Sequence, residues 1–405
     1  MRLRIRAVWV MALLGAAGGV FAQVSLSGTA ETSFFAAAGA GASPGFMYGA
    51  EEYANLRLQI PAGEYAVFYG AFNLTASAGS YPAAAGMTAA ANAGANATGG
   101  LLSGSSVYGE NYAAAIELER LYLQLSSDTL GLQAGLLRVP LGFGLAWGPM
   151  DFLNPRNPLK PDARLRAVLG TNASWYPLGD IKCFAFAAAP RDPLALEGGG
   201  SRFGLGWENH WSAASLQLLA CYESPAFYAV PFPLKGAEYP QGLYRFGLSL
   251  KGDLELGLVT ELIHTLNPAS PELLPGLSAS AGFDYTFLDG RLYALAEYLY
   301  SGAESVSAAG PANPLGRRNR HYLYVALTWF WSDFTSLTLG SGICLDDPSA
   351  AAALTWKHEP LQGLTVDLEF GLPLDGESFG GNAGELGPVM TGYRFSFTAG
   401  LTVKF

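Results

Sequence analysis

The residues best able to do chemistry gather in one segment, 138–166. Its basic side chains are Arg138, Arg156, Lys160, Arg164 and Arg166. Only Asp151 and Asp162 oppose them, so the segment carries a charge of +3 in a chain whose formal net charge is −10. Four Pro residues between positions 149 and 161 argue against a continuous strand and indicate a stiff loop. Basic groups held on such a loop would attract anionic and polar molecules.

The sequence contains no grouping typical of an enzyme. Its four His residues are far apart and lack metal-ligand spacing. A phosphate-binding loop and a Cys-x-x-Cys pair are also absent. The three cysteines are odd in number and widely spaced, which does not support a disulfide or a metal site. We therefore expect no enzymatic activity, cofactor or metal; a catalytic site assembled across strands stays an open alternative.

The composition indicates a membrane protein. Half of the residues are hydrophobic and only 14% are charged, whereas soluble domains carry about 25% charged residues. A membrane-spanning helix needs about 20 consecutive apolar residues, and only the N-terminus approaches that. Because only helices and closed barrels satisfy their backbone hydrogen bonds in lipid, we expect a β-barrel.

The first 22 residues resemble a secretory signal peptide. Arg2, Arg4 and Arg6 precede the apolar stretch 7–20, and Val20-Phe21-Ala22 forms a cleavage site before Gln23. We therefore predict a cleaved signal at 1–22 and a barrel domain at 23–405. Removing the three Arg residues leaves 20 basic and 33 acidic residues, a net charge of −13. That acidity argues against nucleic acid as a partner.

The last strand shows the expected pattern most clearly. Every second residue from 393 to 405 is apolar, and the intervening residues are Arg394, Ser396, Thr398, Gly400, Thr402 and Lys404. Successive side chains of a strand point to opposite sides, so one side is apolar and the other polar, as in a barrel wall. The terminal run resembles the C-terminal assembly signal of outer-membrane proteins, which implies that the barrel assembly machinery is a partner. The residues of this signal are Tyr393, Phe395, Phe397, Leu401, Val403 and Phe405.

Similar patterns predict 18 antiparallel strands, with 16 as the alternative. They span residues 24–34, 52–61, 65–76, 114–126, 130–138, 167–176, 181–189, 202–210, 214–223, 243–250, 254–265, 277–287, 291–300, 321–332, 335–345, 351–358, 364–370 and 392–405. Short turns and longer loops alternate between them. This is the connectivity of an up-and-down transmembrane barrel, with short periplasmic turns and long external loops. The predicted fold class is thus an all-β, single-chain barrel.

Charged side chains on the polar faces are expected to point into the lumen, because charge on the lipid face is costly. The lumen-wall candidates are Arg57, Arg245, Glu255, Glu261, Asp284, Glu297 and Arg394. Ion pairs that merely fill the interior are the alternative role for any one of them.

Residues 131–158, GLQAGLLRVPLGFGLAWGPMDFLNPRNP, carry a family resemblance. Their Trp-Gly step followed by Asp-x-x-Asn-Pro resembles a group of porin-like outer-membrane barrels found in spirochaetes and other bacteria with two membranes. In general porins the loop after the fifth strand narrows the lumen, and 139–166 follows the fifth predicted strand. The resemblance therefore implies a constriction, here basic rather than acidic. Its candidates are Arg138, Trp147, Asp151, Asn154, Arg156, Lys160, Arg164 and Arg166.

Two functions stay open at this stage. The first is an outer-membrane channel for passive diffusion of small polar solutes, biased towards anions by the loop 139–166. In the second, long external loops such as 77–113 bind partners at the cell surface and the pore has no physiological role. Expected partners are outer-membrane lipid and, for a channel, small polar solutes; the sequence leaves the oligomeric state open.

Overall fold

The computed structural model describes residues 24–39, 45–80, 105–108, 111–154, 167–189, 200–225, 242–268, 276–302, 321–347, 349–375, 386 and 393–405. The predicted signal peptide at 1–22 and most of the loop 77–113 lie outside these residues. Within them, no helix is long and apolar enough to cross a membrane.

Nineteen strands form one sheet across the described ranges. They are β1 (Ser25–Gly39), β2 (Phe46–Pro61), β3 (Ala66–Gly79), β4 (Ser105–Tyr108), β5 (Tyr112–Ser126), β6 (Leu130–Leu137), β7 (Val168–Leu178), β8 (Ile181–Ala188), β9 (Arg202–His210), β10 (Ala214–Glu223), β11 (Leu243–Asp253), β12 (Gly257–Leu266), β13 (Leu277–Phe287), β14 (Leu292–Ser301), β15 (His321–Ser332), β16 (Thr335–Cys344), β17 (Ser349–Leu361), β18 (Leu364–Leu374) and β19 (Tyr393–Lys404).

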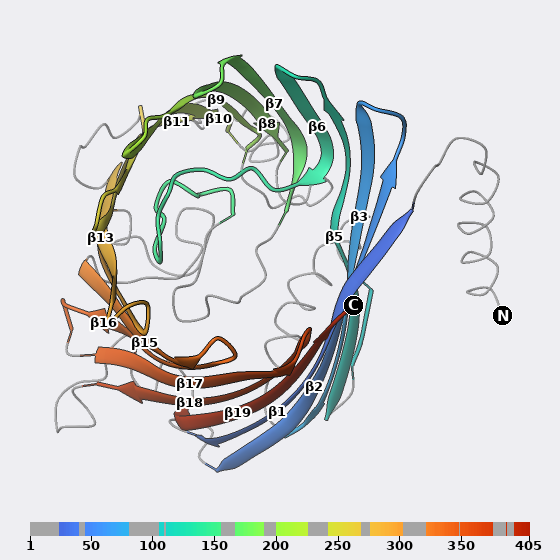
Figure 1. Ribbon diagram of the computed structural model, residues 1–405, viewed down its shortest axis with the longest axis vertical. Helices are drawn as coiled ribbons and strands as arrows, with labels where there is room; N and C mark the ends of the chain where they lie inside the picture. The colour runs from blue at the N-terminus through green and yellow to red at the C-terminus, as the bar shows by residue number, and fades with distance from the viewer. Residues whose placement is uncertain are drawn as a thin grey trace, which may run out of the picture.

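Eighteen of these strands close into a barrel, which confirms the predicted fold class (Figure 1). Each is antiparallel to its neighbours, and β19 pairs with β1 from Thr29↔Lys404 to Ala38↔Phe395. The remaining strand, β4, pairs only with β5, beside residues 113–116. The closing hydrogen bonds run between Gly28 and Phe405 in both directions, at 2.8 and 3.1 Å.

The strand boundaries differ from prediction mainly at the long-loop end. Residues 35–51 were predicted as a loop, but β1 and β2 continue pairing as far as Ala38↔Phe46. The Ala- and Gly-rich sequence there lacks a clear alternation of apolar and polar residues, so it was not predicted as strand. The strands pair nevertheless, because backbone hydrogen bonds do not depend on such alternation. At the other end, Leu288 and Asp289 adopt φ of 53° and 52°, and Gly290 adopts 91°. Such left-handed residues form the tight hairpin turns predicted between short-linked strands.

The wall is apolar outside and polar inside, as the period-two pattern predicts. On β11, Tyr244, Phe246 and Leu248 are exposed on the outer face, while Arg245 and Ser249 are buried. On β19, Phe395, Phe397, Leu401 and Val403 are exposed, and they alternate with Ser396, Thr398, Gly400 and Thr402. A closed sheet with this polarity has its buried side chains in the lumen, where an in-folded segment covers part of the wall.

The close approach at Gly28 makes barrel closure testable. A Cβ at this position would lie 2.6 Å from the Phe405 ring and 2.7 Å from the carbonyl oxygen of Asn55. We expect Gly28→Val to lower the yield of folded barrel, because the backbone of β2 cannot move aside. Gly179→Ala, in an open turn with no atom within 4 Å, is the matched control. The folded fraction is measured by heat-modifiable migration in gels; equal yields for both variants would contradict this role of the β1–β19 seam.

Candidate functional site: an inward loop and a basic wall

The segment that follows β6 leaves the wall and crosses the lumen. Figure 1 shows it as the teal trace inside the ring of strands. Its first anchor is the N–H of Gly142, which donates to Oε1 of Gln217 on β10 at 2.6 Å. The N–H of Phe143 donates to Oγ of Ser249 on β11 at 3.0 Å. Residues 139–154, named the inward loop below, therefore lie against the inner face of β10–β14.

Glu261 of β12 is the central anchor of the inward loop. Its side chain is fully buried and accepts backbone N–H groups of Phe143 at 2.5 Å, Gly144 at 2.6 Å and Met150 at 3.1 Å. Ser249 Oγ donates a further hydrogen bond at 3.1 Å. A buried carboxylate is tolerated only when hydrogen-bonded or paired, and here the loop backbone supplies most of the donors.

Glu297 of β14 anchors the next turn in the same way. It is fully buried and accepts the N–H groups of Ala146 at 2.6 Å and Leu145 at 3.1 Å. The indole Nε1 of Trp147 donates to the Glu297 carbonyl oxygen at 3.2 Å. Gly142, at φ +76°, has no room for a side chain, because a Cβ would lie 2.1 Å from Oε1 of Glu261. The Gly-rich sequence thus allows the backbone to reach the carboxylates.

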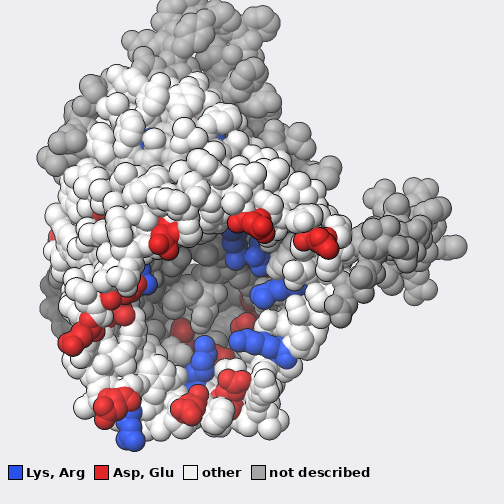
Figure 2. Space-filling view, turned by 45° about the horizontal axis from the view of Figure 1, so that its top comes forward, with Lys and Arg blue, Asp and Glu red and all other residues white. Residues whose placement is uncertain are grey.

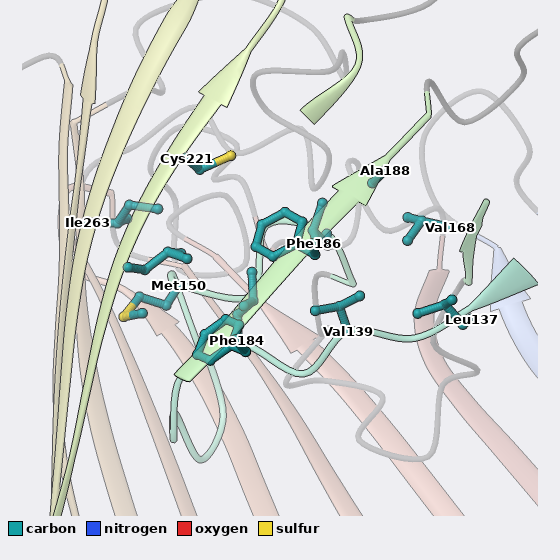
Figure 3. Close-up of a cluster of buried hydrophobic side chains, with 12 residues drawn as sticks. Leu137, Val139, Met150, Val168, Phe184, Phe186, Ala188, Cys221 and Ile263 are labelled. Atoms are coloured by element: carbon teal, nitrogen blue, oxygen red, sulfur yellow. The ribbon is translucent and has the colours of Figure 1, made fainter. Parts of the chain in front are cut away.

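Apolar side chains fill the space between the inward loop and the wall. Met150 is fully buried in a cluster with Ile263 and Cys221 of the wall, and Phe184 and Phe186 lie in the same cluster (Figure 3). Trp147 belongs to a second cluster, where its ring lies 5.5 Å from that of Tyr322. Burying side chains of this size contributes roughly 1.5–3 kcal/mol each, so the loop is held by packing as well as by hydrogen bonds.

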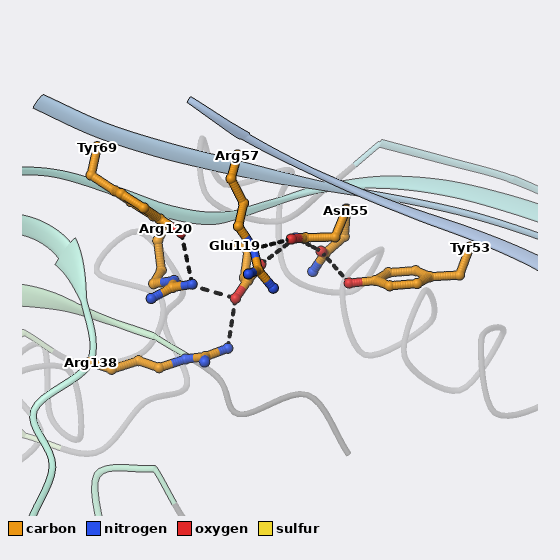
Figure 4. A network of polar contacts seen from close by, with 8 residues as sticks. Tyr53, Asn55, Arg57, Tyr69, Glu119, Arg120 and Arg138 are labelled. Carbon is orange, nitrogen blue, oxygen red and sulfur yellow. Dashed lines mark hydrogen bonds and ion pairs between the residues drawn. The ribbon is translucent and has the colours of Figure 1, made fainter. Parts of the chain in front are cut away.

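The opposite wall carries a cluster of arginines around one carboxylate (Figure 4). Glu119 Oε1 lies 2.8 Å from Arg138 Nη2 and 3.3 Å from Arg120 Nε. Glu119 Oε2 accepts a hydrogen bond from Asn55 at 2.5 Å, and Arg57 donates to Asn55 at 2.6 Å. Two guanidinium groups thus contact one carboxylate, and the third, that of Arg57, is linked to it through Asn55. These three cations and one anion give the cluster a net charge of +2. We name Arg57, Glu119, Arg120 and Arg138 the basic wall.

A cavity of about 420 Å³ adjoins the basic wall, between β5–β8 and the start of the inward loop. Its charged lining residues are Arg120, Arg138 and Lys182, and no carboxylate lines it in the described part of the chain. Amide and hydroxyl groups of Gln124, Gln133, Asn172, Ser126 and Ser174 complete the polar lining. Figure 2 shows a wider hollow in the molecule, with several Lys and Arg side chains on one side of it and Asp and Glu side chains around it.

The constriction candidates predicted from the sequence fall into three groups in the structure. Arg138 belongs to the basic wall. Trp147, Asp151 and Asn154 are only 7%, 4% and 2% exposed, so their side chains pack inside the protein and do not face the passage. Asp151 Oδ1 accepts the N–H of Asn154 at 3.1 Å, which closes the local turn. Their side chains position the inward loop. Arg156, Lys160, Arg164 and Arg166 lie outside the described residues.

Most lumen-wall candidates lie on inward faces. Arg57 belongs to the basic wall, and Glu261 and Glu297 anchor the inward loop. Arg245 contacts Glu223 and lies 4.9 Å from the ring centre of Phe152 of the inward loop. Asp284 and Arg394 lie on the inner sides of β13 and β19, alternating with the exposed Phe283 and Phe395. The prediction for Glu255 is wrong: it lies in the exposed turn 254–256, because β12 begins at Gly257.

The sequence prediction missed the charged pair Glu119 and Arg120. Adjacent strand residues normally point to opposite sides, but the β3–β5 register shifts here, from Ala71↔Arg120 to Phe72↔Leu118. This β-bulge leaves Glu119 unpaired and turns both charged side chains inward. A signal was present: outward apolar residues fall at even positions up to Leu118 and at odd positions from Leu121. That change of phase identifies a bulge.

Comparisons with known proteins identify the fold. No protein-family model matches the chain, and no curated protein matches it. A BenF-like porin from Pseudomonas fluorescens Pf-5 is similar at a TM-score of 0.57 and 9% identity, covering 96% of this chain and 100% of that one. The chain has a porin-like fold. Pseudomonas aeruginosa OccK7 (TM-score 0.55, 10% identity) and Acinetobacter baumannii OccAB3 (0.50, 11%) each cover 95% of this porin-like chain and 99% of their own.

The carboxylate anchors predict a specific effect on the passage. Replacing Glu261 by Ala removes the acceptor of three loop N–H groups, each charge-assisted bond being worth about 1.5–3 kcal/mol. We expect the inward loop to detach, which raises single-channel conductance and current noise in planar bilayers. Glu117→Ala removes an exposed carboxylate on the inner face of β5 and serves as control. If Glu261→Ala and Glu117→Ala conduct alike in folded protein, the inward loop does not limit the passage.

Proposed function

We propose that this chain is an outer-membrane channel through which small polar solutes diffuse passively. One observation carries the proposal: a closed 18-strand barrel contains a loop that is anchored across its lumen by buried carboxylates. A barrel of this size encloses a water-filled passage unless something fills it. The inward loop fills one side, against β10–β14, and leaves the basic wall and its cavity on the other. Within the described residues, this arrangement narrows a channel without blocking it.

The surface of the barrel supports the proposed location. Its outer face carries exposed Leu, Phe, Tyr and Trp side chains on every side, among them Phe246, Leu262, Trp331 and Phe397. Such a band is stable in lipid and costly in water. The secretory pattern at 1–22 would direct the chain to the envelope, where the terminal strand would serve the barrel assembly machinery as its signal. Export through the signal peptide and insertion by the assembly machinery are both parts of this proposal.

The resemblance to spirochaete-type barrels is supported by the structural role of the motif that carries it, the Trp-Gly step followed by Asp-x-x-Asn-Pro. In the segment from Trp147 to Asn154, the Trp ring packs against Tyr322 and Asp151 closes the turn to Asn154. The motif that resembles the spirochaete-type barrels therefore builds the end of the inward loop. We infer that this chain shares with those barrels a loop held in the lumen.

The charges of the lumen favour anionic solutes. The inward carboxylates Glu261 and Glu297 are fully buried under the inward loop, and Glu223 lies between Arg245 and Arg202. The basic wall, with three Arg residues and one Glu, lies next to the cavity, whose charged lining residues are all basic. Charges in a confined passage focus the field and select ions by sign. We infer that solutes bearing a carboxylate or phosphate group pass more readily than cations of the same size.

Ion selectivity in planar bilayers tests this function. We expect the wild-type channel to prefer chloride over potassium, and the Arg120→Ala, Arg138→Ala double variant to shift its reversal potential towards cation preference. Arg291→Ala, in the turn between β13 and β14, is the control and should leave selectivity unchanged. Absence of any conductance from folded protein would overturn the channel itself.

A second experiment distinguishes the contribution of the basic wall from that of the basic residues in the predicted loop 139–166. Arg156, Lys160 and Arg164 are replaced together by Ala and measured in the same salt gradient. A shift equal to that of the wall variant would assign selectivity to both segments. An unchanged selectivity in both variants would contradict the anion bias while leaving the channel intact.

A further inference from the structure

One charged side chain lies on the otherwise uncharged outer face of the barrel wall. Among the Asp, Glu, Lys and Arg residues of the described strands, Glu52 alone falls on the outward face, as the strand registers show. It pairs with Thr32, two residues from Phe34, which is 59% exposed on the outside. Glu52 is itself exposed. Its neighbours Glu51 and Tyr53 point inward, so the assignment follows from strand alternation.

A hollow of about 590 Å³ lies next to this carboxylate. Its outward lining consists of Glu52 with Ala30, Ala54, Leu74, Ala76, Ala114 and Ile116. The Ala side chains stand in register on four adjacent strands: Ala30 pairs with Ala54, and Ala76 pairs with Ala114. Elsewhere the outer wall presents mainly Leu, Phe, Tyr and Trp. The missing side-chain volume creates an apolar groove that ends at a negative charge.

The hydrogen-bond partner of Glu52 within the chain does not neutralise the negative charge of the Glu52 carboxylate. Thr32 Oγ1 donates a hydrogen bond to it at 2.7 Å, but a hydroxyl group carries no charge. A carboxylate that faces a membrane is costly unless a cation reaches it. A second copy of this chain would not supply that cation from its described strands, since their outward faces carry no Lys or Arg. Charge complementarity therefore points to a cationic group in the membrane itself.

We propose that this groove binds a membrane lipid with a primary-ammonium headgroup. An acyl chain lies along the alanines, and the ammonium group pairs with Glu52. The aromatic side chains Phe34, Phe46 and Tyr48 are exposed on the long-loop side of Glu52, where amphipathic rings mark the membrane interface. Tyr48 is four residues from Glu52, about 13 Å along the strand, so Glu52 lies towards the same side of the membrane as these rings. The site rests on the proposed membrane location and is independent of the pore.

Native mass spectrometry of the detergent-purified full chain tests the site. Dioleoyl phosphatidylethanolamine and dioleoyl phosphatidylcholine have the same acyl chains but differ in the headgroup, as primary ammonium and quaternary ammonium. We expect tighter binding of the ethanolamine lipid, and Glu52→Gln should weaken it about tenfold, the loss of one charge-assisted hydrogen bond. The choline lipid should be unaffected by this change. Ala54→Phe fills the groove and should weaken both lipids.

The controls keep the outcomes distinct. Glu117→Gln removes an inward carboxylate of β5 and should leave both affinities unchanged. Equal affinity for the two lipids in the wild type, or a preference that survives Glu52→Gln, overturns the proposal. Self-association that Ala54→Phe abolishes, without lipid binding, also overturns it and assigns the groove to protein contact. Single-channel conductance of Glu52→Gln, expected to match the wild type, separates failure of this site from failure of the channel.

Discussion

Hydrogen bonds from the inward loop to Glu261 and Glu297 determine what the interior of this barrel can be. An irregular segment that crosses a lumen leaves backbone N–H groups without strand partners, and buried polar groups need such partners. The two carboxylates have the reciprocal requirement, since neither is exposed to solvent. Together they accept five backbone N–H groups of the loop. Loop and wall are therefore stable only with each other, and either alone would leave buried polar groups unsatisfied.

The same contacts shape the electrostatics of the passage. The chain is acidic overall, with a formal net charge of −10, yet its best-buried inner carboxylates are occupied by backbone N–H groups. Glu208 is likewise paired with Lys182, at 3.1 Å. Glu208, Glu261 and Glu297 therefore contact groups of the protein itself, whereas the basic wall adjoins a cavity. The bulge at Glu119 and Arg120 contributes to this asymmetry, because it adds a guanidinium group to the inner face. The anchoring of the inward loop and the proposed anion preference thus depend on the same arrangement of inner-wall charges.

Sequence patterns were sufficient for the fold and insufficient for the site. The alternation of side chains and the short turns follow from local geometry, so all 18 barrel strands and the β1–β19 closure were predictable. Glu261 and Glu297 were recognised as inward residues, but their loop contacts span 111 to 152 residues of sequence and have no local signal. Trp147, Asp151 and Asn154 stood out as unusual residues in a loop, and the structure shows that they shape it from within. The phase change across Glu119 and Arg120 was readable but requires the assumption of a bulge.

The position of the inward loop is tested most directly by a cross-link between Met150 and Gly247. The Met150 side chain lies 3.0 Å from the position that a Cβ on Gly247 would occupy. In a variant whose native cysteines are replaced by Ser, Met150→Cys and Gly247→Cys should form a disulfide in folded protein in bilayers. The single-channel conductance should then equal that of the reduced form, because the bond holds the loop where it already lies. Failure to cross-link, or a conductance that changes when the bond forms, would contradict a loop anchored on this wall.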